Sequence, residues 1–171
     1  PGVVYPEGWR FLREVSCGHD GVTFSFRLNA EGEEDITLLR SFILDRESGR
    51  LLIRYALSDT PAARALESVR LVLRPLLNGR NINHLSAAVP ERTAFVHPLG
   101  IETGSYPGFT FQPGEDVPPL FMQISHPGLQ HSSFVAAPDW YFHVLYPVEK
   151  ERGYDFEEDL LMPGAFVTSL S

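Results

Sequence analysis

Apolar and polar residues alternate along much of the chain, with the period of two that is typical of half-buried β-strands. In residues 21–29, the apolar Val22, Phe24 and Phe26 are separated by the polar Thr23 and Ser25. Successive side chains of a strand point to opposite faces of the sheet. This pattern therefore predicts a strand with one buried face.

The next two apolar segments predict a β-hairpin. Residues 36–45 and 50–59 flank a short polar connection in which Ser48-Gly49 supplies turn chemistry. Further strands are predicted at 67–77 (ending near Pro75), 92–97, 108–112, 119–125, 132–137 and 139–148. Short helices are predicted only at 59–67 and 156–161. We therefore predict an all-β fold, an antiparallel β-sandwich with few short helices, formed by residues 1–171 as a single domain.

Composition and charge narrow the classes of function. The chain has 171 residues and a net charge of -8, which argues against binding to a nucleic-acid backbone and leaves neutral ligands such as sugars. A single cysteine excludes an internal disulfide framework and is typical of a reducing, cytoplasmic compartment. No apolar segment is long enough to predict a membrane span or a signal peptide. The first residue is Pro1, so we expect a processed or excised fragment.

Motifs for metal, cofactor or nucleophilic chemistry are absent from the sequence. The six histidines are scattered without a metal-binding spacing, so no metal site is predicted. There is no phosphate-binding loop, no Gly-x-Ser-x-Gly motif and no sign of a bound cofactor. No catalytic residue is therefore assigned.

Sugar recognition is compatible with two segments, because it requires flat aromatic faces bordered by planar polar groups. Alternation predicts that strand 139–148 has three side chains on each face: Trp140, Phe142 and Val144 on one, and Tyr141, His143 and Leu145 on the other. One face is expected to be core, and Trp140 is expected to pack there rather than stack on a ligand. The loop Arg80-Asn81-Ile82-Asn83-His84 is either a solvated turn or part of a polar binding surface.

A cluster of acidic residues near the C-terminal end could be catalytic or structural. Glu157, Glu158 and Asp159 are adjacent and so point in different directions, which disfavours the converging pair that glycoside hydrolysis needs. If residues 156–161 form a helical turn, Asp155 caps it and forms a capping box with Glu158. We expect Arg152 to pair with Glu158 or Asp159 and to brace this segment.

Two ordered motifs resemble the N-terminal domain of bacterial and archaeal glycogen debranching enzymes. The first is the segment 146–166, with matching positions at Tyr146, Glu149 or Glu151, Arg152, Gly153, Glu158, Asp159, Leu160, Pro163, Gly164 and Phe166. The second lies in the segment 69–85, with matches at Arg74, Pro75, Leu76, Leu77, Arg80, Asn81 and His84. The resemblance is good over the last two-thirds of the chain and poor over the first third. The Arg-x-Tyr-His-Gly motif that usually opens the family's domain is missing, so we expect an N-terminally incomplete portion of that domain.

The resemblance implies a β-sandwich that precedes an (α/α)-barrel carrying the amylo-α-1,6-glucosidase activity. It further implies a non-catalytic role for this chain in shaping an α-glucan site, with glycogen or maltooligosaccharide as ligand and the barrel as covalent partner. The residues expected at the glucan are Arg80, Asn81, His84, Arg152 and Glu158 in polar roles, with Trp140 or Tyr141 as the stacking face. Those expected to form the structural motif are Gly153, Asp155, Asp159, Pro163 and Gly164, with Pro163-Gly164 ending the sandwich.

Two alternatives remain open at this point. The chain could be a glucanotransferase in its own right, with carboxylates drawn from Asp155, Glu157, Glu158 and Asp159. It could also be a stand-alone sugar-binding or interaction sandwich.

Overall fold

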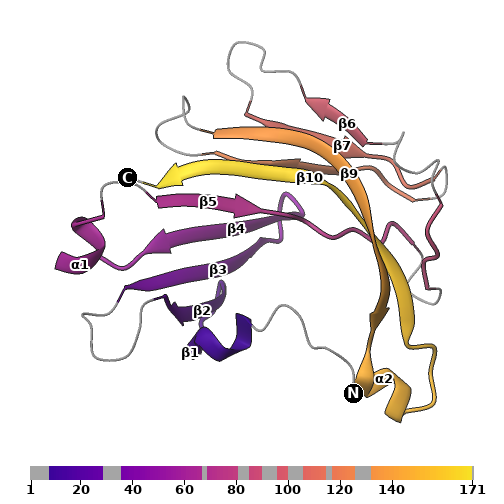
Figure 1. Ribbon diagram of the computed structural model, residues 1–171, viewed down its shortest axis with the longest axis horizontal. Coiled ribbons are helices and arrows are strands. Elements are labelled where there is room, and N and C mark those ends of the chain that lie inside the picture. Colours follow the sequence, from indigo (N-terminus) through magenta and orange to yellow (C-terminus); the bar gives the residue numbers. More distant parts are fainter. Residues whose placement is uncertain are drawn as a thin grey trace. The chain divides into compact units, whose positions relative to one another are not determined.

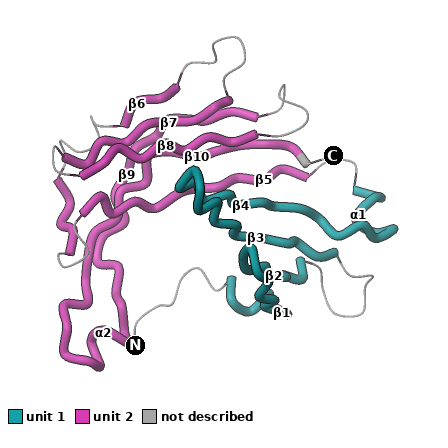
Figure 2. The backbone as a smooth tube through the Cα atoms, turned by 180° about the vertical axis from the view of Figure 1, so that it is seen from behind, with its two compact units in different colours: residues 1–68, 171 teal, residues 69–170 magenta. Residues whose placement is uncertain are grey.

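The computed structural model describes residues 8–28, 36–66, 69–80, 85–89, 96–99, 106–114, 117–125 and 132–170. The chain divides into two compact units (Figure 2). Unit 1 comprises residues 1–68 together with Ser171, and unit 2 comprises residues 69–170. Nearly all regular structure is antiparallel strand, so the predicted all-β class is confirmed. No helix in the described part of the chain is long and apolar enough to cross a membrane.

Unit 1 is an antiparallel sheet with the strand order β1-β2-β3-β4 (Figure 1). Its elements are η1 (Gly8–Phe11), β1 (Leu12–Cys17), β2 (Gly21–Arg27), β3 (Thr37–Asp45), β4 (Arg50–Leu57) and the short helix α1 (Pro61–Arg64). The predicted hairpin is confirmed as β3 and β4, and the predicted helix at 59–67 as α1. The hydroxyl of Thr60 caps α1 by accepting a hydrogen bond from the Ala63 N–H at 3.1 Å. Strand β1 was not predicted.

The alternation in β2 and β3 places three phenylalanine rings around the side chain of Arg40 in the unit 1 sheet. The guanidinium of Arg40 lies 5.2 Å from the ring centres of Phe24 and Phe42 and 5.1 Å from that of Phe26. A guanidinium over aromatic rings is attracted by their negative faces. These three rings therefore hold the side chain of Arg40 against the sheet.

Unit 2 contains two three-stranded sheets, with the orders β5-β10-β9 and β6-β7-β8. Its elements are β5 (Val69–Leu73), β6 (Val96–Leu99), β7 (Gly108–Phe111), β8 (Leu120–Gln123), β9 (Ser132–Leu145), α2 (Pro147–Glu151) and β10 (Glu157–Leu170). The segments 132–137 and 139–148 were predicted as separate strands, but a single strand, β9, runs through Pro138 and ends at Leu145, and α2 begins at Pro147. Beyond β5, strands β9 and β10 continue together as an arm that carries α2 at its end (Figure 1).

The two sheets of unit 2 enclose a common apolar core. Phe109 of β7 packs against Phe134 of β9 and Phe166 of β10, with ring centres 4.9 and 5.8 Å apart. Phe111, Leu161 and Leu77 complete the buried cluster. Side chains from facing sheets meet here, as in a sandwich. Unit 2 by itself therefore has the layered packing that the strand pattern predicts.

Strand β10 corrects two predictions. Residues 156–161 do not form a helix, because β10 begins at Glu157. Pro163 and Gly164 do not end the element either, since they lie in the interior of β10. A β-bulge accommodates them, because Pro163 lies between the register pairs Met162↔Asp139 and Gly164↔Ala136 and so faces two residues of β9. A bulge is a place where a sheet tolerates proline, which has no N–H to donate.

Candidate functional site

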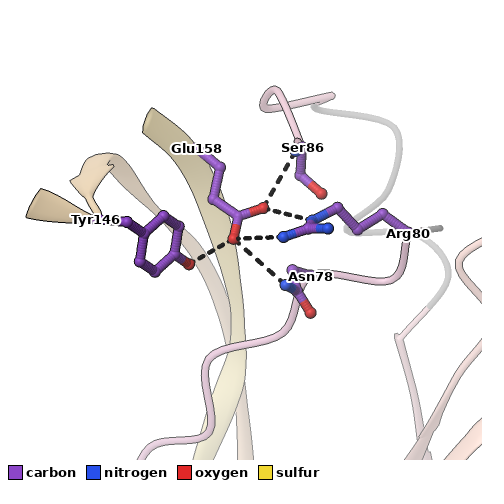
Figure 3. A network of polar contacts seen from close by, with 5 residues as sticks. All are labelled: Asn78, Arg80, Ser86, Tyr146 and Glu158. Carbon is purple, nitrogen blue, oxygen red and sulfur yellow. Dashed lines mark hydrogen bonds and ion pairs between the residues drawn. The ribbon is translucent and has the colours of Figure 1, made fainter. Parts of the chain in front are cut away.

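Glu158 is the centre of a buried polar network in unit 2 (Figure 3). It is only 1% exposed, although it is a charged residue. Arg80 donates side-on to the carboxylate, from Nε to Oε2 at 2.8 Å and from Nη2 to Oε1 at 3.2 Å. The hydroxyl of Tyr146 and Nδ2 of Asn78 also donate to Oε1, and the backbone N–H of Ser86 donates to Oε2 at 3.2 Å. These five hydrogen bonds connect Glu158 on β10 to the segment that follows β5, which carries Asn78, Arg80 and Ser86, and to Tyr146, which follows β9.

The segment that follows β5 reaches Glu158 because β5 itself covers only part of the edge of β10. Strand β5 pairs with residues 166–170 of β10. Further along the same strand, Leu77 and Leu161 exchange two backbone hydrogen bonds, and the Asp159 N–H donates to the Ser86 carbonyl at 2.8 Å. The chain that follows β5 thus runs along β10, and this brings Arg80 to Glu158.

Burial alone raises the pKa of Glu158, because it disfavours the charged form. The hydrogen bonds, first of all that from Arg80, outweigh burial and lower the pKa from 4.5 to about 2. Burial, followed by the hydrogen bond to Glu158, raises the pKa of Tyr146 from 10.0 to about 12. At neutral pH the network therefore consists of a carboxylate, a guanidinium and a neutral phenol.

This arrangement is unsuited to acid–base catalysis by Glu158. A carboxylate offers about four lone-pair positions, and five hydrogen bonds occupy them here. A general acid or base also works best with a pKa near the working pH, whereas this one is about 2. Glu158 is therefore suited to holding backbone segments together and not to proton transfer.

The neighbouring Asp159 stabilises a second bulge. Between the pairs Glu158↔Val144 and Leu160↔Tyr141, β10 has one residue and β9 has two, Phe142 and His143. The Asp159 carboxylate accepts hydrogen bonds from the N–H of His143 at 2.9 Å and from the N–H of Ala88 at 2.8 Å. These contacts, with that of His143 first, lower the pKa of Asp159. Asp159 therefore connects the bulge to the segment that follows β5.

The bulge changes the two faces that simple alternation predicts for β9. Trp140 is partly buried and packs against the core of unit 2, as expected. Tyr141 and Phe142, predicted on opposite faces, are both exposed, at 42% and 59%. His143 is also exposed, and its Nδ1 lies 2.5 Å from Oε1 of Glu157. The hydrogen bond with Glu157 raises the pKa of His143.

The remaining predicted residues lie in different places. Arg152 pairs with Glu149 at 3.3 Å, not with Glu158 or Asp159, so the predicted brace is wrong. It is the C-cap residue of α2, and Gly153 follows in a left-handed conformation with φ 77°. Asp155 is exposed and caps no helix, because it lies between the end of α2 and the start of β10. Asn81 and His84 lie outside the described residues.

Sequence reasoning missed three of the partners of Glu158. Asn78 and Ser86 carry no pattern that predicts burial of a charge, and Ser86 contributes its backbone N–H. Tyr146 was marked only as a position of the family motif. Pro147 does signal the start of α2, with Tyr146 as its N-cap residue, but this signal does not predict the contact of the Tyr146 hydroxyl with Glu158.

The network predicts a specific dependence of stability on pH. The pKa of Glu158 in the folded protein is below its ordinary value of 4.5, so its contribution is complete above about pH 4.5 and is lost as the pH falls toward about 2. One pKa unit corresponds to about 1.4 kcal/mol, which gives about 3 kcal/mol in total.

Denaturant unfolding at about pH 6 and about pH 3 measures this contribution. We expect the wild-type chain to lose more stability between these pH values than the Glu158→Gln variant, in which the group no longer titrates. Equal losses would show that Glu158 does not carry the effect.

Comparisons with known proteins give one positive finding. The sequence profile of the family "Glycogen debranching enzyme N terminal" matches residues 1–171. This match extends over the first third of the chain, where the resemblance of individual motifs is poor. Separate comparisons with curated proteins and with solved structures found no match. Because the profile covers the whole chain, the chain belongs to the family of glycogen debranching enzyme N-terminal domains.

Proposed function

We propose that this chain is a non-catalytic domain that helps to form and orient the α-glucan site of a glycogen debranching enzyme. The residues act together as one domain, and the amylo-α-1,6-glucosidase activity belongs to an (α/α)-barrel that follows in the parent protein. The observation that carries the proposal is the family match over residues 1–171. The ligand is a neutral oligosaccharide, in keeping with a net charge of -8.

The state of Glu158 supports a role without catalysis. Its carboxylate lies at the centre of the family motif, and its lone pairs are used by Arg80, Tyr146 and the other donors. Arg80 donates two of those hydrogen bonds, and the neighbouring Asn81 and His84 are proposed as contacts of the sugar. Tyr141 and Arg152, both exposed on the arm, are further proposed contacts.

Fluorescence provides a direct binding test, because the chain has two tryptophans and one of them adjoins Tyr141. Replacing the exposed Trp9 by phenylalanine leaves Trp140 as the reporter. We expect maltooligosaccharide to change the emission of this variant saturably. The same samples should be assayed for glucan disproportionation, since turnover by the isolated chain would establish the glucanotransferase alternative instead.

The parent enzyme provides the decisive comparison. Deleting residues 1–171 should raise KM for a branched glucan by about tenfold, which corresponds to the loss of about 1.4 kcal/mol of binding free energy. Turnover of a small synthetic glucoside, which does not reach the domain, serves as the control for an intact barrel. An unchanged KM for the glucan in an enzyme that is otherwise active would refute the proposal.

A further inference from the structure

The bulge in β9 directs two neighbouring side chains outward from the arm. In a regular strand, Phe142 and His143 would point to opposite faces. Here both lie opposite the single residue Asp159, and both are exposed. Bulges are enriched next to functional sites, where they redirect a side chain. The pairing of an aromatic ring with an imidazole on one surface is therefore a feature that the bulge creates.

The backbone at His143 is strained, and a hydrogen bond to Asp159 holds it in this conformation. His143 has φ 56°, and it is the only non-glycine residue with positive φ in the described part of the chain. Its N–H donates to Asp159, which is itself tied to the N–H of Ala88. Left-handed conformations of residues with a Cβ cost free energy and persist where the surroundings impose them. A glycine would fit here at lower cost, so the conformation alone does not account for a histidine.

The side chains around the bulge have the chemistry of a sugar subsite. Phe142 is 59% exposed, so much of a large apolar side chain meets solvent. The ring of His143 lies 6.5 Å from it, centre to centre. Because Glu157 binds Nδ1 of His143, the imidazole is oriented and its Nε2 is left as the second hydrogen-bonding atom. The Glu157 carboxylate is 47% exposed and keeps acceptor capacity for a hydroxyl.

We propose that Phe142, His143 and Glu157 form a binding subsite for one pyranose unit of a neutral oligosaccharide. The apolar face of the sugar stacks on Phe142, and two adjacent hydroxyls bond to His143 and Glu157. This inference rests on the proposed function and locates it at the bulge of β9 on the arm. It adds residues that neither the strand pattern nor the family motif assigns to the glucan.

Three variants of the chain test the subsite with maltotriose as the probe, followed by calorimetry or by NMR shifts. Phe142→Ala should weaken binding by about tenfold through loss of the stacking face. His143→Gly removes the imidazole but suits the positive φ, so it should weaken binding by several-fold without lowering the unfolding midpoint. Glu157→Gln should have an intermediate effect, because one acceptor oxygen remains.

Phe121→Ala is the matched control, because Phe121 lies on β8 and is 65% exposed. It should leave the affinity unchanged. Maltotriose binding that is equal in wild type, Phe142→Ala and His143→Gly overturns the subsite while leaving the proposed function intact. Absence of any maltotriose binding by the wild-type chain also overturns the subsite, and the KM of the parent enzyme then decides the proposed function separately.

Discussion

Replacing Glu158 by glutamine should lower the free energy of unfolding by about 3 kcal/mol. Breaking a buried ion pair is costly because the remaining charge is left without compensation in a low-dielectric environment. Glutamine keeps the size of the side chain, but it is neutral, and its NH₂ group would face donors such as Arg80 and the Ser86 N–H. Urea unfolding at neutral pH, followed by circular dichroism, measures the difference.

The adjacent residue provides a matched control for this variant. Glu157 has the same side chain on the same strand, but it is 47% exposed. Glu157→Gln should change stability by less than about 0.5 kcal/mol, as surface substitutions usually do. A double variant, Arg80→Leu with Glu158→Leu, should recover part of the loss, since removing both charges avoids an unpaired one. If Glu158→Gln is no more harmful than Glu157→Gln, the network does not hold the unit together.

Replacing Gly164 by alanine should be at least as damaging, with a loss of about 3 kcal/mol or more. Gly164 has φ 147°, in a region that residues with a Cβ rarely adopt. A Cβ at this position would lie 2.2 Å from the Val135 carbonyl oxygen and 3.0 Å from the Ala137 N. Both are backbone atoms of β9, so relief of the clash requires separation of β9 from β10.

Two other glycines separate the effect of the clash from that of conformation. Gly153 also has positive φ, 77°, but nothing lies within 4 Å of a Cβ added there, so Gly153→Ala should cost about 1 kcal/mol. Gly114→Ala meets no neighbour either and should be close to neutral. The thermal midpoint should therefore be highest for Gly114→Ala, lower for Gly153→Ala and lowest for Gly164→Ala. A Gly164→Ala variant as stable as Gly153→Ala would contradict the close approach of β9 and β10.

The strands that could be predicted are those whose alternation is local and uninterrupted. In β2, the residues Val22, Phe24 and Phe26 repeat with period two, and the β3–β4 hairpin carries its own turn residues. These signals arise from the side chains within one element and its immediate neighbours. The predicted all-β class followed from them, whereas the family resemblance rested on the motifs around Arg80 and Glu158, and the family profile confirms it.

The course of β10 could not be predicted, because it depends on β9. Locally, Pro163-Gly164 is a stop signal, and the acidic residues before it are typical of a helix start. Pairing with β9 over ten register positions overrides both signals. The bulge that Ala137 and Pro138 form opposite Pro163 removes the need for an N–H at Pro163. Pairing with a distant strand overrides local propensity where it supplies the hydrogen bonds of the backbone.

The partner of Glu158 was likewise a matter of tertiary structure. By sequence distance, Arg152 was the nearest arginine to the acidic cluster, but Glu158 binds Arg80, which lies 78 residues away. The sequence by itself determined the all-β class, the strands whose alternation is uninterrupted, and the presence of a motif of acids and an arginine. Only the tertiary structure decided which acid is buried, which arginine compensates its charge and which side chains the bulge exposes. These outcomes depend on which edges of a sheet are left open and which segments return to cover them, and no local pattern encodes that information.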